Sequence, residues 1–138
     1  MKRLYKNHYL EEQRKYRYIE YTILLNDGGW RTAYLNVTGS VLQNVDYDCI
    51  NLYVHGGLTY SSSHLPYEVD VPPERNAWYI GWDYAHAFDG YDLKAVNKYF
   101  GEIKYNSLAL RRCYKIYTLE DVRVDCIEAI NELYEERF

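Results

Sequence analysis

The chain has 138 residues with a net charge of −4 at pH 7, and 48% of its residues are hydrophobic, a composition that excludes a disordered chain. Its length suits one domain, over residues 1–138, with one hydrophobic core. The negative net charge disfavours direct binding to nucleic acid, and the 18 tyrosines fit half-buried strands or a surface that stacks on ligands.

The first 38 residues predict two different elements. Residues 1–16 are polar and basic with a weak helical period, which predicts a basic arm or a short helix. Residues 16–25 alternate and are rich in strand-forming side chains, and residues 30–38 resume this pattern. The stretch NDGG between them supplies residues that tolerate a positive φ, so we expect a β-hairpin here.

A third strand and a long loop are expected in the middle of the chain. Residues 49–60, CINLYVHGGLTY, alternate between apolar and polar side chains, and Gly56 and Gly57 end or bulge the predicted strand. Residues 61–77 are polar and hold all three prolines, which predicts a loop. Long loops in compact domains are often functional.

The second half predicts one more strand and two helices. Residues 78–84, WYIGWDY, are expected to form a fourth strand, and residues 92–100 a short helix. The terminal helix is expected over residues 118–137, where Thr118 and Asp121 form a variant of the capping box. Its apolar stripe at helical spacing consists of Leu119, Val122, Cys126, Ile130 and Leu133.

These elements predict an α+β fold, a mainly antiparallel sheet with the C-terminal helix packed on one face. Charge is uneven along the chain, since residues 1–18 carry six Lys or Arg against two Glu, and residues 118–138 carry seven acidic residues against two Arg. The two segments could pair within one chain or between subunits of a homo-oligomer, or they could be two solvated faces.

Cysteine usage and the absence of apolar spans indicate a cytoplasmic protein. The three cysteines, Cys49, Cys113 and Cys126, are odd in number and far apart, which argues against a zinc knuckle and a disulfide framework. The first residues contain no signal-peptide core, and no apolar run is long enough to span a membrane. We therefore expect a soluble protein without a membrane partner.

Polar side chains at the ends of the third and fourth predicted strands are typical of a site. His55 ends the third strand, and Asp83, His86 and Asp89 follow the fourth. These side chains bind divalent metals, and a bound metal could activate water. Without metal, His86 with Asp83 or Asp89 could act as acid and base, so His86 and Asp83 are the candidate catalytic residues. The alternative is that the carboxylates cap turns and the histidines bond to backbone.

The same region is also interpreted as a pocket for a nucleotide-like ligand. Gly56 and Gly57 would let backbone amides approach a phosphate, and Arg75 offers a polar end. Tyr53, Tyr60 and Trp82 are among the rings that offer stacking faces. This interpretation requires no cofactor, although the residues could also bind a divalent metal. The predicted ligand-binding residues are His55, Gly56, Gly57, Tyr60, Trp82, Asp83, His86 and Asp89.

A third hypothesis is a surface that binds another protein. Its anchors would be Trp30 and Arg31 in the hairpin, because Trp and Arg dominate the energetics of protein interfaces. Nothing in the sequence singles out the partner.

Three stretches, Val54–Tyr60, Trp78–His86 with Asp89, and Tyr117–Leu133, resemble a family of small proteins common in bacteriophages and prophages, whose function is unassigned. Members carry a strand ending in VHGGLT[YF], then WW[FIL]GFD.AHA.D, and a C-terminal helix of the YV..EC..L type. The resemblance covers roughly residues 45–135. This chain departs from it in the stretch NLYVH, which lacks the aspartate usually found just before the histidine.

The resemblance implies an accessory phage protein that acts against host defence in the host-cell cytoplasm. We therefore expect a counter-defence protein, for instance an anti-CRISPR protein. It would act by binding rather than turnover, sequestering a nucleotide-like ligand or blocking a defence effector protein such as a CRISPR nuclease. The alternative is a metal-dependent hydrolase that uses the His/Asp cluster.

Overall fold

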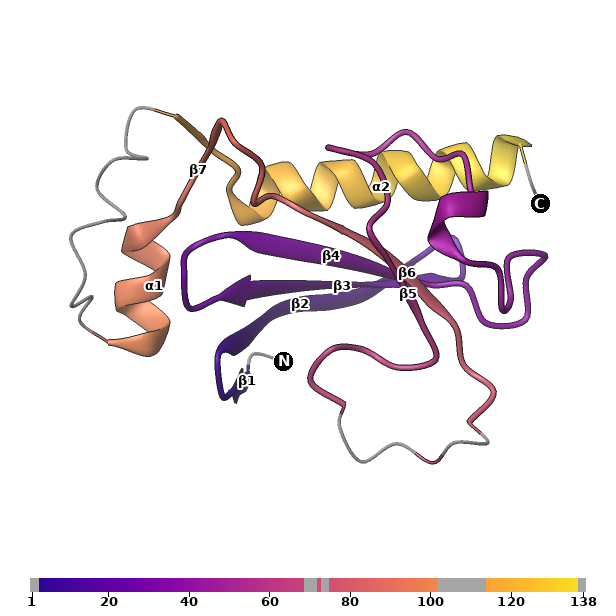
Figure 1. Cartoon of the computed structure of the whole chain (residues 1–138), viewed down its shortest axis with the longest axis horizontal. Helices are drawn as coiled ribbons and strands as arrows, with labels where there is room; N and C mark the ends of the chain where they lie inside the picture. The colour runs from indigo at the N-terminus through magenta and orange to yellow at the C-terminus, as the bar shows by residue number, and fades with distance from the viewer. Residues whose placement is uncertain (1–2, 69–71, 73–74, 102–113, 137–138) are drawn as a thin grey trace.

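Figure 1 shows the computed structural model of the chain, which describes residues 3–68, 72, 75–101 and 114–136. The strands are β1 (Arg3–Tyr5), β2 (His8–Tyr16), β3 (Ile19–Asn26), β4 (Arg31–Asn36), β5 (Tyr60–Ser62), β6 (Tyr79–Asp83), β7 (Asp89–Gly90) and β8 (Lys115–Ile116). The helices are η1 (Tyr47–Cys49), α1 (Leu93–Phe100) and α2 (Leu119–Glu136). Within these ranges, no helix combines the length and the apolar character needed to cross a membrane.

Six strands form one antiparallel sheet in the order β1-β2-β3-β4-β6-β5, and β7 and β8 form a separate parallel pair. Helix α2 lies along one face of the sheet and contacts β2, β3 and β4 (Figure 1). The predicted α+β class, with the C-terminal helix on one face of an antiparallel sheet, is therefore confirmed.

The hairpin predicted around NDGG is strands β3 and β4. These strands pair from Leu25 opposite Arg31 onwards. In the turn, the Asn26 side chain accepts a hydrogen bond from the Gly28 amide at 2.7 Å, and Gly29 has φ +101°. Only glycine adopts that φ without steric cost, so the turn sequence itself fixes where the chain reverses.

Residues 3–16 form strands β1 and β2, so the basic arm or short helix predicted over residues 1–16 is wrong; residues 1–2 lie outside the described residues. Strand β2 pairs with β3 along its whole length. Arg17 and Tyr18, with φ of +50° and +70°, make the tight turn between them. Cross-strand pairing with an apolar neighbour therefore overrides the weak helical period of this segment.

A β-bulge in β2 explains why the strand pattern is hidden in the sequence. The pairing register shifts between Leu10 and Glu12. Leu10 packs with Leu24 on the sheet face away from α2, whereas the consecutive residues Glu11 and Glu12 both reach arginines on the α2 side. One extra residue in a strand breaks the alternation of side chains, so a period of two is not visible across it.

Arg31 is buried at the junction of four segments. Its guanidinium donates to both carboxylate oxygens of Glu11 at 2.6 and 3.1 Å, to Asp92 at 2.8 Å and to the Tyr117 carbonyl at 3.0 Å. Only 4% of Arg31 is exposed. The prediction that Arg31 anchors a protein interface is therefore wrong, because the side chain joins β4 to β2, α1 and the start of α2.

Glu12 forms a second, partly buried ion pair, which attaches α2 to the sheet. Its carboxylate accepts two hydrogen bonds from Arg123, both at 2.7 Å, and one from the Tyr21 hydroxyl at 2.6 Å. The hydrogen bonds from Arg123 lower the pKa of Glu12, with help from Tyr21 and against the opposing effect of burial. Burial, together with the hydrogen bond to Glu12, raises the pKa of Tyr21 to about 12, so the phenol stays a donor.

We expect acid to weaken this attachment. Because the pKa of Glu12 lies below its ordinary value of 4.5, the ionised carboxylate stabilises the fold above that pH, and the contribution is lost as the pH falls through the folded-state pKa. The free energy of unfolding, measured by urea titrations at several pH values, should decrease as the pH is lowered from about 6 to about 3. Glu12→Gln should reduce that slope, whereas the control Glu128→Gln, on the exposed side of α2, should keep it. An unaltered slope in Glu12→Gln would contradict the assignment.

Helix α2 matches the terminal helix predicted over residues 118–137, of which Arg137 lies outside the described residues. The capping box is formed, since the Thr118 amide donates to Asp121 at 3.1 Å and the Asp121 amide donates to the Thr118 hydroxyl at 3.2 Å. Its buried side chains are Val122, Cys126, Ala129, Ile130 and Leu133. They pack against the apolar face of the sheet, which is the role predicted for the stripe.

Residues 50–59 are irregular, so the strand predicted over 49–60 is wrong except at Tyr60, where β5 begins. The alternate apolar side chains of this segment do enter the core. Its backbone, however, bonds to α2, since the Tyr53 amide donates to the Glu132 carboxylate at 3.1 Å. The alternation that predicted a strand therefore reflects burial beside a helix.

Two further predictions are confirmed. The strand expected over residues 78–84 is β6, and the helix expected over 92–100 is α1. Asp92 caps α1, since its side chain accepts a hydrogen bond from the Ala95 amide at 3.1 Å. Residues 102–113 lie outside the described residues.

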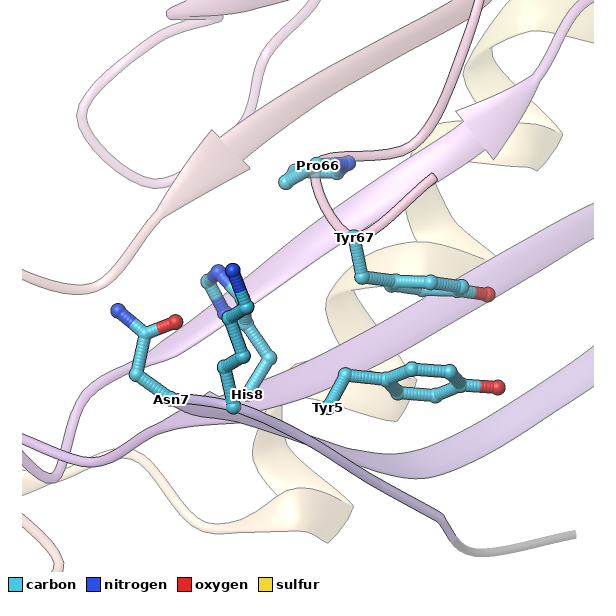
Figure 2. Close-up of a pocket in the computed structure, with 6 residues that line it drawn as sticks. Tyr5, Asn7, His8, Pro66 and Tyr67 are labelled. Atoms are coloured by element: carbon cyan, nitrogen blue, oxygen red, sulfur yellow. The ribbon is translucent and has the colours of Figure 1, made fainter. Parts of the chain in front are cut away.

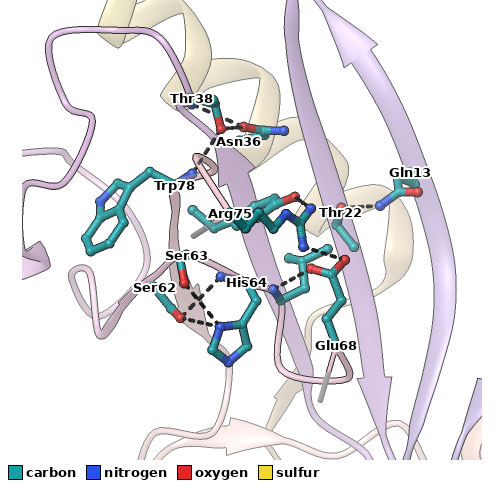
Figure 3. A network of polar contacts seen from close by, with 12 residues as sticks. Gln13, Thr22, Asn36, Thr38, Ser62, Ser63, His64, Glu68, Arg75 and Trp78 are labelled. Carbon is teal, nitrogen blue, oxygen red and sulfur yellow. Dashed lines mark hydrogen bonds and ion pairs between the residues drawn. The ribbon is translucent and has the colours of Figure 1, made fainter. Parts of the chain in front are cut away.

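The described part of the predicted long loop is held by Arg75 (Figure 3). Its guanidinium donates to Glu68 and to the Tyr79 hydroxyl, each at 2.9 Å. Nearby, His64 Nδ1 lies 3.3 and 3.4 Å from the two serine hydroxyls that precede it. These polar groups of the loop are thus already hydrogen-bonded to one another or to Tyr79. Tyr79 belongs to the hydrophobic cluster on the side of the sheet away from α2. Arg75 therefore does not supply a polar end to the predicted pocket.

Candidate metal centre

His55 lies between the end of β6 and the start of α2. Its ring stacks on Tyr84, with centroids 4.8 Å apart and 9° between the planes, and contacts Tyr117 at 4.5 Å. The Tyr84 hydroxyl donates to Asp125 at 2.6 Å. Burial and this hydrogen bond raise the pKa of Tyr84, so the phenol stays protonated and keeps its orientation. The position of the His55 imidazole is thus set by packed rings.

Asp89 holds His55 and His86 together. The Nε2 atom of His55 lies 2.9 and 3.0 Å from the two carboxylate oxygens of Asp89, which is only 4% exposed. The same carboxylate accepts the His86 backbone amide at 3.0 Å, and the Asp89 amide donates back to the His86 carbonyl. One buried carboxylate therefore pairs with one histidine and shapes the turn that carries the other.

Gly56 makes room for His86. Its φ is +70°, and a Cβ atom at this position would lie 2.0 Å from Nε2 of His86, far inside van der Waals contact. The two histidine rings, from His55 and His86, meet edge to face at 5.2 Å. Gly57 differs, because a Cβ there would meet nothing within 4 Å and its amide closes a turn onto the Val54 carbonyl. The predicted phosphate cradle thus has one of its amides already engaged.

The three side chains form a compact donor set. One ligand atom from each of His55, His86 and Asp89 can be chosen so that all lie within 4.8 Å of one another. Asp83 adjoins the set, with its carboxylate 3.7 Å from His86 Nε2. That carboxylate also accepts hydrogen bonds from the Ala85 amide at 3.0 Å and the Thr59 hydroxyl at 3.2 Å. Both earlier readings of these carboxylates apply, since Asp83 and Asp89 cap local turns and also face histidines.

Two of the predicted stacking residues lie elsewhere. Trp82 is 1% exposed and its indole donates to the Tyr84 hydroxyl at 3.0 Å, so it is a core residue. Tyr60 packs edge to face on Tyr34 at 5.0 Å, in the cluster on the sheet face away from α2. The prediction that Tyr60 and Trp82 stack on a ligand beside His55 is therefore wrong.

An open cavity of about 410 Å³ adjoins the donor set. Its lining residues are Tyr53, Val54, His55, Gly56, Tyr117 and Asp125. Tyr117 and Asp125 were not predicted as site residues, whereas Tyr53 was predicted as a stacking face. Tyr53 is 91% exposed, although it stands in the segment expected to be a strand. Asp125 is one of many acidic residues on the polar side of α2, so no signal in the sequence separates it from its neighbours.

The donor set suits a late first-row divalent ion such as Zn²⁺. Two imidazoles and one carboxylate are typical of hydrolytic zinc sites, which leave a further position for water. In a tetrahedral site with bonds near 2.0–2.1 Å, ligand atoms stand about 3.3 Å apart. The Nε2 atom of His55 is already 2.9 Å from Asp89, and His86 has a side chain that is 37% exposed and sits at a turn. The three ligand atoms lie within 4.8 Å of one another, so a bound ion would have to draw them closer together.

The chain matches no protein-family model, no curated protein and no solved structure.

Proposed function

We propose that this protein is a metal-dependent hydrolase whose zinc ligands are His55, His86 and Asp89. The observation that carries the proposal is the convergence of these three ligand groups, from segments more than 30 residues apart, within 4.8 Å beside an open cavity. A three-ligand site leaves one position for water, whose pKa the metal lowers to about 7.

Each residue around the ion has a distinct task in this proposal. Asp89 is buried and would bind the ion through one of its two carboxylate oxygens, both of which face His55. Tyr84 keeps the His55 ring in place by stacking, and Tyr117 does so by a tilted ring contact. Asp125 lines the cavity, and we propose that its carboxylate is the general base that accepts a proton from the attacking water. The Tyr84 hydroxyl holds one Asp125 oxygen, which leaves the other oxygen for this task.

The cavity indicates the class of substrate. Its wall combines the rings of Tyr53 and Tyr117 with the Asp125 carboxylate. A carboxylate repels phosphate groups and tolerates neutral or cationic ones. We therefore expect an ester or amide of a neutral or cationic small molecule. In the reaction, water adds to the carbonyl carbon and the alcohol or amine leaves with a proton.

The counter-defence role stays a prediction that rests on the sequence resemblance. A nucleotide-like ligand at this site is disfavoured by the positions of Tyr60 and Trp82 and by the Asp125 carboxylate. Native mass spectrometry of the purified protein with cyclic nucleotides tests that ligand directly. A retained nucleotide of unchanged mass would favour sequestration over hydrolysis.

Removing a proposed ligand should abolish tight zinc binding. We expect His86→Ala to weaken Zn²⁺ binding by at least roughly 100-fold, because the loss of a direct ligand exceeds the 10–100-fold effect of changes in outer contacts. Isothermal titration calorimetry of the chelator-treated protein measures this affinity. The matched control is His64→Ala, since His64 is partly buried on the other side of the sheet and contacts serine hydroxyls.

The hydrolytic step is tested separately. The zinc-loaded protein should release para-nitrophenol from para-nitrophenyl acetate faster than free zinc does. Asp125→Asn should reduce this rate while zinc affinity stays close to that of the unaltered protein. Equal zinc affinity in the unaltered protein and in His86→Ala would refute the metal site. Tight zinc binding without hydrolysis of any neutral or cationic ester or amide would refute the proposed hydrolytic activity but not the proposed zinc site.

A further inference from the structure

A second cavity lies on the other side of the sheet, between the turn that joins β1 to β2 and the loop that follows β5 (Figure 2). Its volume is about 360 Å³, within the range of small-molecule sites. Its lining, mostly apolar, consists of Tyr5, Lys6, Asn7, His8, Pro66 and Tyr67. Tyr5 and Tyr67 join the core cluster away from α2, whereas His55 neighbours residues of the cluster under α2. The cavity is therefore separate from the candidate metal centre.

Two stacked tyrosines form a rigid wall of this cavity. The rings of Tyr5 and Tyr67 are stacked, with centroids 4.2 Å apart and 16° between their planes, and Figure 2 shows Tyr67 above Tyr5. Burial raises the pKa of Tyr67 to about 12, so its phenol is uncharged. A preformed aromatic wall and a proline cover favour a flat apolar group, because neither has to be ordered on binding.

One of the lining residues, His8, carries an unsatisfied polar atom. Within the described residues, Nδ1 of His8 is buried and has no hydrogen-bond partner. Burial lowers the pKa of His8, and the charge of Asp27 opposes this effect only in part. His8 is therefore a neutral imidazole at pH 7, and Nδ1 can carry its proton and donate it. A buried polar atom without a partner costs free energy, which a ligand acceptor would recover.

Lys6 and Asn7 complete the recognition chemistry. The ammonium group of Lys6 and the amide of Asn7 stand in the same turn as His8 and line the same cavity. Figure 2 shows Asn7 and His8 across the cavity from the tyrosine rings. An apolar ring facing the tyrosines and an anionic acceptor facing Lys6 and His8 would use both walls at once.

We propose that this cavity binds a small aromatic carboxylate, with the ring against Tyr5 and Tyr67 and the carboxylate between Lys6 and His8. The cavity holds one ring with a short acid group. The ligand would contact segments next to both edge strands, β1 and β5. It would therefore link the β1–β2 turn to the loop after β5. The proposal rests on this cavity alone and does not depend on zinc binding at His55.

The test measures the binding of benzoate to the protein. Chelator is added so that benzoate does not bind through a metal ion at another site. We expect saturable binding by ligand-observed NMR with a Kd on the order of 1 mM or below. His8→Phe keeps the ring volume and removes Nδ1, and it should weaken binding roughly tenfold. Lys6→Gln should weaken binding severalfold, and benzylamine, which carries the opposite charge, should bind at least tenfold more weakly than benzoate.

The matched control is Tyr18→Ala, in the next turn of the sheet, where the tyrosine is 95% exposed. It should bind benzoate as the unaltered protein does. Because Lys6 is exposed, Lys6→Gln retains the fold even where His8→Phe does not. The proposal is overturned by an absence of benzoate binding, by equal affinity for benzylamine, or by folded Lys6→Gln and His8→Phe variants that bind benzoate unchanged.

Discussion

Arg31→Leu should lower the free energy of unfolding by about 3–5 kcal/mol, because it leaves the buried carboxylate of Glu11 without its partner. Glu11 has a side chain that is 1% exposed and takes two of the Arg31 hydrogen bonds. The same change removes the contacts to Asp92 and the Tyr117 carbonyl. Such a loss is a large share of the 5–15 kcal/mol that stabilises a typical domain. Urea denaturation at pH 7 followed by circular dichroism measures it.

Two further variants show that the buried charge is the cause. Glu11→Leu combined with Arg31→Leu should recover most of the stability, because an apolar pair replaces an ion pair at little net cost. Arg75→Leu removes a partly exposed salt bridge to Glu68 and should cost at most about 1 kcal/mol. A loss below about 1 kcal/mol in Arg31→Leu would contradict the role of Arg31 as the junction of these segments.

Gly56→Ala should disrupt the candidate metal centre without touching a ligand. The new Cβ atom would stand 2.0 Å from His86 Nε2, so the imidazole must move away from His55 and Asp89. We expect Zn²⁺ affinity to fall about 10–100-fold, the range found when the orientation of a metal ligand is lost. Calorimetric titration of the folded variant with zinc measures the change.

Gly57→Ala is the matched control for this prediction. Gly57 has φ +82°, close to the +70° of Gly56, so alanine brings a similar backbone strain of about 1–2 kcal/mol at both positions. At Gly57, however, the new methyl group meets nothing within 4 Å. Both variants should therefore lose stability, and only Gly56→Ala should lose zinc affinity. Equal zinc affinities in the two variants would remove the steric argument for Gly56.

The elements that were predicted correctly are those with local chemical signals. The NDGG turn requires positive φ, the Thr118 and Asp121 pair caps a helix, and the stripe of α2 repeats at helical spacing. Each signal acts between residues only a few positions apart, so it is legible without knowledge of the fold. Asp92 belongs to the same class, since it caps α1 within one turn.

The elements that were predicted wrongly depend on distant partners. The bulge at Glu11 hides the alternation of β2, and only pairing with β3 reveals the strand. Residues 50–59 alternate because they are buried beside α2, where Glu132 takes a backbone amide that a neighbouring strand would otherwise bind. The sequence suggests that Arg31 is an exposed interface residue, whereas in the fold it is hydrogen-bonded to Glu11 and Asp92 from distant segments.

The sequence alone determined which chemical groups this protein could use, since His55, His86 and Asp89 stand out by type and by their position after apolar segments. It did not determine that they meet. The ring stack on Tyr84, the space left by Gly56 and the Asp125 wall bring together residues from separate segments. Local patterns record the conformation of short segments, whereas a site requires distances between segments, and only the packing of the sheet against α2 decides those distances.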